Sequence, residues 1–125
     1  MSSRHCILVG APVDSGKRRT GCLMGPDAYR TAGLAAALES LDHTVEDIGN
    51  VTPAPHAPDD GTGPLHEPNL TRAWTESLSE AAEAAMARGL PIFLGGDHAL
   101  ALGTVRGVAN HAASEGRPLF VLWLD

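Results

Sequence analysis

The sequence predicts an α/β fold with a mostly parallel sheet. Three short apolar runs, at residues 6–10, 91–94 and 118–124, have the composition of buried parallel strands. A more polar run at residues 43–48 is typical of a strand nearer the edge of a sheet. Stretches with apolar residues at helical spacing separate these runs, and such alternation of strand and helix is characteristic of α/β chains.

The first half of the chain predicts strand, loop, helix and strand in that order. The strand at residues 6–10 is followed by a glycine-containing stretch at residues 12–25, which is interpreted as a loop. Pro26 suits the first turn of a helix, and the carboxylate of Asp27 complements the helix dipole there. The apolar residues that continue this helix at helical spacing are Ala28, Ala32, Ala35, Leu38 and Leu41.

Residues 50–69 predict a surface loop that is rich in proline and glycine. They contain five of the nine prolines, a density that neither a helix nor a strand tolerates. A loop of about twenty residues is long for a compact domain. Because the alternation of helix and strand resumes after it, we interpret the loop as a surface excursion within one domain, of which residues 1–125 are a portion.

The second half predicts helix, strand and helix. Asn69 is a suitable cap for a helix that ends near Gly89. The apolar stripe of this helix consists of Leu70, Trp74, Leu78, Ala81 and Ala85. A strand at residues 91–94 and a helix over about residues 98–114 follow.

The apolar run at residues 118–124 predicts a fourth strand that leads directly to Asp125. A parallel strand this apolar is normally covered on both faces. The functional groups of α/β sheets lie just beyond the carboxyl ends of the strands. We therefore expect residues 1–125 to be the N-terminal part of a larger domain.

Composition excludes several classes of protein. Nine basic and fifteen acidic residues give a net charge of −6, which argues against general nucleic-acid binding. No run of eighteen apolar residues predicts a membrane span. The N-terminus lacks the apolar core of a signal peptide, and Cys6 and Cys22 do not form a CxxC pair. The sequence thus predicts a reduced, cytoplasmic protein that binds neither membranes nor nucleic acids.

Two candidate sites are weak on their residues. Residues 10–18 resemble a phosphate-binding loop, but Ala11 stands where glycine is required and Arg18 where serine or threonine is required. Without that hydroxyl no side chain is in place for Mg²⁺, so a nucleotide-binding domain has little support. Cys22 has no histidine nearby in the sequence, and a small hydrophobic role is the simpler interpretation.

The turn after residues 91–94 is the stronger candidate. Two glycines precede Asp97 and His98, and this arrangement delivers both side chains at the carboxyl end of a strand. Asp125 follows another apolar run, so His98 and Asp125 could converge on one metal ion if their strands are adjacent. A capping histidine and a solvated aspartate are the structural alternatives. The remaining histidines are scattered: His5, His43, His56, His66 and His111.

Several motifs together resemble the N-terminal portion of the arginase family, in the ureohydrolase superfamily. The most specific is Leu-Gly-Gly-Asp-His at residues 94–98 with Ala-Leu-Gly-Thr at residues 101–104, which is close to the family pattern GGDHSxAxGT. Ala99 replaces the usual serine. The other matching segments are residues 7–12, residues 21–26 with Arg30 and Ala32-Gly33, residues 47–50, and residues 122–125, which resemble the strand that leads into the family motif DAHxD.

This resemblance implies a three-layer α/β/α fold with an eight-stranded parallel sheet and a pair of Mn²⁺ ions. It implies that His98 binds one ion and that Asp125 bridges both. Asp97 would help to orient the site without touching metal. The other family ligands lie in the rest of the DAHxD motif and in an SxDxD motif, neither of which occurs within residues 1–125.

The implied activity is hydrolysis of the guanidinium group of L-arginine to ornithine and urea. Agmatinase or formimidoylglutamase activity, and a non-catalytic α/β binding module, are the alternatives. The resemblance also implies a homo-oligomer, trimeric or hexameric. It places no substrate-gripping or proton-shuttling residue within residues 1–125. Because two ligands cannot complete a coordination sphere, we expect these residues alone to be inactive and to bind Mn²⁺ weakly.

Overall fold

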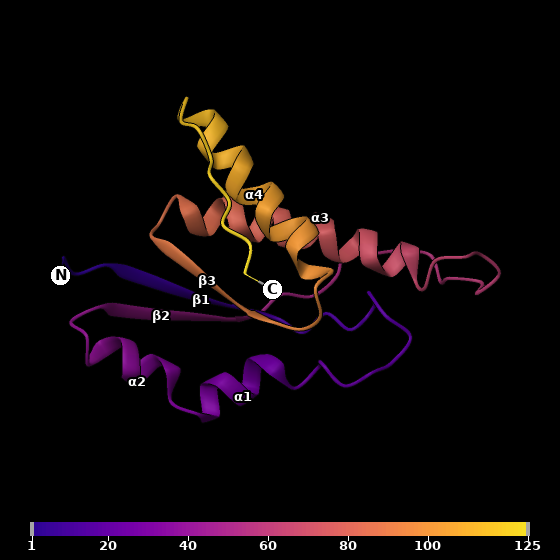
Figure 1. The fold of residues 1–125 in the computed structure, drawn as a ribbon, viewed down its shortest axis with the longest axis horizontal. Helices are drawn as coiled ribbons and strands as arrows, with labels where there is room; N and C mark the ends of the chain where they lie inside the picture. Colours follow the sequence, from indigo (N-terminus) through magenta and orange to yellow (C-terminus); the bar gives the residue numbers. More distant parts are fainter. Residues whose placement is uncertain (1, 125) are drawn as a thin grey trace.

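The computed structural model describes residues 2–124 and has three layers (Figure 1). A parallel sheet separates α1 and α2 on one face from α3 and α4 on the other, which confirms the predicted α/β class. The elements in chain order are β1 (His5–Ala11), α1 (Gly25–Thr31), α2 (Leu34–Glu39), β2 (Thr44–Asn50), α3 (Pro68–Met86), β3 (Leu90–Gly95) and α4 (Leu100–Ser114). None of these helices is long and apolar enough to cross a membrane.

β1 is the central strand of the sheet, whose order is β2-β1-β3. Both neighbours run parallel to it, and Cys6 on β1 pairs with Val45 on β2 and with Leu90 on β3. Residues 6–9 of β1 are at most 2% exposed, whereas no residue of β2 is fully buried. The first three predicted strands are therefore confirmed, and β2 lies at an edge of the sheet, as its polar sequence predicted.

The helix predicted after Pro26 is in fact two short helices. Gly33 separates α1 from α2 and has a φ of +85°, in the left-handed region that interrupts a right-handed helix. The apolar spacing continues across this break because both helices lie against the same face of the sheet. α1 contacts β1 and β3, and α2 contacts β2.

Residues 51–67 contain no helix or strand, and their main structural contribution is a cap on α3. The carboxylate of Asp59 accepts hydrogen bonds from the backbone N–H groups of Asn69 (3.0 Å) and Leu70 (3.3 Å). Asn69 was predicted to be the cap but lies inside the helix, which begins at Pro68. The cap therefore comes from a residue ten positions before Asn69, a contact that local sequence spacing does not reveal.

α3 and α4 pack against each other and cover one face of the sheet. Trp74 and Leu78 on α3 join Ala11 and Val13 in one buried cluster. Gly103 and Gly107 on α4 allow the two helices to approach closely. A Cβ atom on Gly103 would lie 2.6 Å from the Leu78 Cβ atom, and one on Gly107 would overlap the backbone of α3 at the Ser79 carbonyl oxygen. Small residues are thus required along this helix contact.

We expect Gly107→Ala to destabilise the fold by about 1–3 kcal/mol, because the added methyl group forces apart two packed helices. Helix propensity alone favours alanine over glycine by about 1 kcal/mol. A net loss of stability would therefore come from the overlap of the added methyl group with α3. The free energy of unfolding from urea titration checks this. Gly63→Ala is the matched control, since a Cβ atom there meets nothing within 4 Å. Equal stability of Gly107→Ala and wild type would contradict the packing described here.

Arg30 connects α1 to the carboxyl end of β2. Its Nε and Nη2 atoms donate to the two carboxylate oxygens of Asp47 at 2.7 Å and 2.9 Å. Its Nη1 atom donates to Asn50 at 2.6 Å and to Asp27 at 3.1 Å. The bidentate pairing with Arg30 lowers the pKa of Asp47 below its ordinary value, and the backbone N–H of Gly49 adds to this effect.

This pairing predicts a loss of stability in acid. Because the pKa of Asp47 is depressed in the folded state, its contribution is present above the unfolded pKa of about 4 and is lost as pH falls through the folded pKa. We expect Asp47→Asn to cost about 1 kcal/mol at pH 7 and to make unfolding less sensitive to pH below about 4. Urea titrations at a series of pH values measure both effects. Asp27→Asn, which removes one more exposed contact of the same arginine, is expected to change little.

The predicted fourth strand is wrong in this structure. Residues 118–124 form neither helix nor strand, and Phe120 and Leu122 are 89% and 82% exposed. The segment runs back along α4 (Figure 1), where Leu119 and Leu122 line a cavity of about 280 Å³ with Val105 of that helix. A strand forms only when its backbone groups pair with a neighbouring strand, and within residues 2–124 none pairs with this segment. The apolar composition predicted a buried strand, but residues 118–124 are exposed because no neighbouring strand or helix within residues 2–124 covers them.

Candidate functional site

The carboxyl ends of β1 and β3 lie side by side, and the turn that follows β3 forms the candidate site. Ala11 at the end of β1 pairs with Gly95 at the end of β3. Gly96 has a φ of +59°, and a Cβ atom there would lie 2.5 Å from the carbonyl oxygen of Ala11. A Cβ atom on Gly25, at the start of α1, would overlap the carbonyl oxygen of Gly95. Three backbone segments thus meet at distances that only glycine permits.

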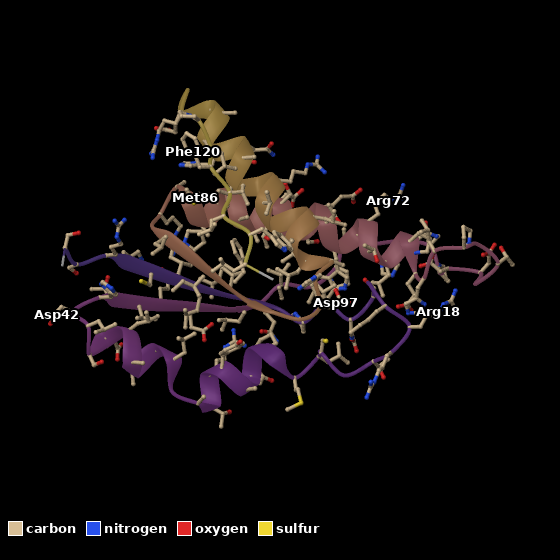
Figure 2. The ribbon with its side chains drawn as sticks, viewed as in Figure 1. Arg18, Asp42, Arg72, Met86, Asp97 and Phe120 are labelled. Atoms are coloured by element: carbon tan, nitrogen blue, oxygen red, sulfur yellow. The ribbon has the colours of Figure 1, made fainter. Side chains whose placement is uncertain are left out.

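Asp97 is buried in this turn and ties it to the loop after β1 (Figure 2). Its side chain accepts hydrogen bonds from the backbone N–H groups of Gly16 (2.7 Å) and Ala99 (2.9 Å). Its own N–H donates to the carbonyl oxygen of Val13 at 2.8 Å. The residue is only 7% exposed. Since each carboxylate oxygen accepts one backbone N–H, Asp97 holds two loops together on either side of the turn.

His98 is exposed and lies beside free space. The helix predicted to start near His98 begins at Leu100, so the histidine belongs to the turn. Its ring makes an edge-to-face contact with Trp123, with centroids 5.8 Å apart and an interplanar angle of 81°. The two residues line a cavity of about 400 Å³, and on another side His98 lines one of about 390 Å³ with Lys17 and Cys22. The imidazole is therefore accessible to a ligand.

The donor chemistry of this turn fits one position in a manganese coordination sphere. An imidazole nitrogen is a common ligand for such ions, and both Asp97 oxygens are already engaged by backbone N–H groups. Asp125 lies outside the described residues, so its predicted convergence with His98 stays a prediction. Residues 2–124 contain no group of three or more histidine, cysteine or acidic side chains that could hold a metal ion.

Asp14 organises the loop between β1 and α1 and was not singled out by the sequence. Its carboxylate accepts hydrogen bonds from the N–H groups of Gly21 (2.9 Å) and Cys22 (3.3 Å) and from the ammonium of Lys17 (2.9 Å). The Gly21 N–H and the Lys17 ammonium hold the pKa of Asp14 below its ordinary value. Lys17 also donates to the carbonyl oxygen of Arg19 at 2.7 Å. The Lys17 ammonium is thus engaged by groups of its own loop. The phosphate-binding alternative therefore gains no support from this lysine.

A larger cavity of about 670 Å³ lies elsewhere, between residues 56–70 of the long loop and Arg18. None of its lining residues belongs to the turn at residues 95–99. The large volume of this cavity is therefore no reason to regard it as the candidate site. The position of His98 and Asp97 at the carboxyl ends of adjacent parallel strands is the stronger indication.

A model of the arginase family matches residues 4–125. The chain belongs to the arginase family. It is 50% identical over 128 residues to the arginase of Brucella melitensis and 48% identical over 130 residues to that of Agrobacterium fabrum. Its fold is similar to the crystal structure of arginase from Bacillus subtilis, with a TM-score of 0.72 and 34% identity over 85% of this chain and 36% of that one. The resemblance seen in the motifs is confirmed.

The matched regions cover this chain almost completely, but they cover only part of each relative. They include 97% and 98% of this chain, against 40% of the Brucella arginase and 38% of the Agrobacterium arginase. The chain therefore spans about two-fifths of the length of the curated relatives it matches.

Proposed function

We propose that this chain contributes to a manganese-dependent hydrolysis of the guanidinium group of L-arginine, which yields ornithine and urea. The observation that carries the proposal is the turn at residues 95–99, which presents an exposed His98 at the carboxyl edge of the sheet while a buried Asp97 fixes its backbone. Relatives named arginase at 48–50% identity support the same reaction. The proposal treats residues 1–125 as the N-terminal portion of a single domain.

Three residues have roles in the proposed site. His98, as a neutral imidazole, would donate a ring nitrogen lone pair to one metal ion. Asp125 would supply its carboxylate as a second metal ligand within residues 1–125. Asp97 would fix the turn to the loop after β1 and so hold the backbone of His98 in place.

Manganese ions, when bound, would lower the pKa of a water molecule so that hydroxide is available at neutral pH. The chain's own contribution is to orient His98 and to close one side of the site. The loop at residues 12–22 supplies that side, since Lys17 and Cys22 share a cavity with His98. Asp97 and Asp14 fix this loop at its two ends through hydrogen bonds to Gly16 and Gly21.

We further propose that residues 1–125 by themselves do not hydrolyse arginine. Only His98 and Asp125 of the proposed ligand set fall within them, and two protein ligands do not hold Mn²⁺ tightly. The absence of a three-residue metal cluster within residues 2–124 supports this. A cytoplasmic location and a trimeric or hexameric assembly of the working enzyme belong to the same proposal, on the support of the family relationship.

The test is a urea-release assay with a chimera. Residues 1–125 are joined to the part of the Brucella melitensis arginase that lies beyond the matched region, and residues 1–125 alone are the comparison. We expect Mn²⁺-dependent urea release from L-arginine by the chimera and none by residues 1–125. A folded, manganese-loaded chimera without activity would refute the proposal.

A further inference from the structure

Within residues 2–124, the exposed His98 ring contacts an aromatic ring and makes no side-chain hydrogen bond. The hydrogen bonds of the turn are made by the Asp97 carboxylate and by backbone groups. Over residues 2–124, none involves the His98 imidazole. Histidine ligands of metal ions are usually oriented by a hydrogen bond from their second ring nitrogen. The described residues instead offer an aromatic ring, that of Trp123.

We propose that Trp123 is a positioning residue that orients the His98 imidazole for metal binding. This inference rests on the proposed function, because the contact can orient a metal ligand only if His98 is one. With centroids 5.8 Å apart and planes at 81°, the two rings have the edge-to-face geometry that aromatic pairs prefer. Rotation of the imidazole about its side-chain torsions would break that contact, so the indole restricts the direction in which the ring nitrogens point.

The exposure of the C-terminal segment agrees with a specific contact at Trp123. Leu122 and Leu124 are 82% and 84% exposed, whereas Trp123, the largest of the three side chains, is 55% exposed. Trp123 is therefore less exposed than Leu122 and Leu124, although all three side chains line the cavity beside His98. His98 and Trp123 also both line the cavity of about 400 Å³. The indole thus forms a wall of the space into which the His98 ring projects.

The first readout needs no metal. In the 125-residue chain with isotope-labelled histidine, ring-current effects from the indole shift the His98 ring protons in the NMR spectrum. We expect Trp123→Ala to abolish that shift and Trp123→Phe to retain most of it, because phenylalanine also offers a ring face. Leu122→Ala is the matched control, since it shortens an exposed apolar side chain in the same segment without removing an aromatic ring.

The second readout is broadening of the His98 ring signals by Mn²⁺, which detects weak binding and separates His98 from the other histidines. We expect the Mn²⁺ concentration for half-broadening to rise about fivefold in Trp123→Ala, and to stay near the wild-type value in Trp123→Phe and Leu122→Ala. Broadening that is the same in wild type and Trp123→Ala overturns the positioning role but leaves the proposed function standing. If His98 is not broadened in the wild-type chain, the metal role of His98 fails, and the role of Trp123 fails with it.

Discussion

Replacing His98 with alanine is expected to abolish manganese-dependent urea release by the chimera. The substitution removes the donor nitrogen at the carboxyl edge of the sheet. Even outer partners of metal ligands change metal affinity by about 10–100-fold, so loss of a ligand itself is expected to reduce activity by more than about 100-fold. Because His98 is exposed, the free energy of unfolding is expected to change by less than about 0.5 kcal/mol. Activity and stability therefore separate in this variant.

His56→Ala is the matched control for this experiment. His56 is also exposed, and its only side-chain hydrogen bond within residues 2–124 is a local one to the carbonyl oxygen of Ala54. We expect its metal content and activity to equal those of the unmodified chimera. Metal content is measured by elemental analysis after removal of free Mn²⁺. A His98→Ala chimera that keeps both its manganese and its activity contradicts the assignment of His98.

Asp97→Ala is expected to have the largest effect on stability, about 3 kcal/mol. The substitution removes a buried carboxylate and leaves the N–H groups of Gly16 and Ala99 without their acceptor. A hydrogen bond to a charged group contributes about 1.5–3 kcal/mol, and this substitution removes two of them. The loop after β1 is then held to the turn chiefly by the backbone hydrogen bond between Asp97 and Val13. Urea titration followed by circular dichroism measures the free energy of unfolding.

Two further variants sharpen this result. Asp97→Asn keeps one acceptor oxygen but places an amide NH₂ group against the second backbone N–H, so its stability is expected to lie between wild type and Asp97→Ala. Asp60→Ala is the exposed control, because Asp60 also accepts two hydrogen bonds, both from Thr62. We expect it to cost less than about 1 kcal/mol. Similar losses for Asp60→Ala and Asp97→Ala would show that burial of Asp97 is not the cause.

Most of the fold could be predicted from sequence because its signals are local. The apolar run of β1 and the turn glycines after β3 each determine their own element within a few residues. The errors arise where structure depends on a partner. Residues 118–124 were predicted as a strand from their apolar composition, but within the described residues no strand pairs with them. The break at Gly33 was missed because the apolar spacing continues across it.

The candidate site was likewise predictable only in part from the sequence. Motif spacing was enough to select Asp97 and His98, since both directly follow a glycine pair at the end of a strand. It could not reveal that Asp97 accepts the N–H of Gly16, which lies 81 positions earlier in the chain. The role of Asp14 in the loop after β1 was missed because its N–H partners, Gly21 and Cys22, lie seven and eight positions later, beyond the two-residue reach of a local aspartate turn. The contact of Trp123 with His98 depends on tertiary structure alone.

The central claim is that His98 is a metal ligand at the carboxyl edge of the sheet. Its most direct test is anomalous X-ray scattering at the manganese edge from crystals of the chimera grown with Mn²⁺. We expect an anomalous peak within bonding distance of a His98 ring nitrogen, with the Asp125 carboxylate on the same ion. Manganese bound elsewhere in the chimera, with the His98 ring making no contact to it, would show that His98 is not a ligand.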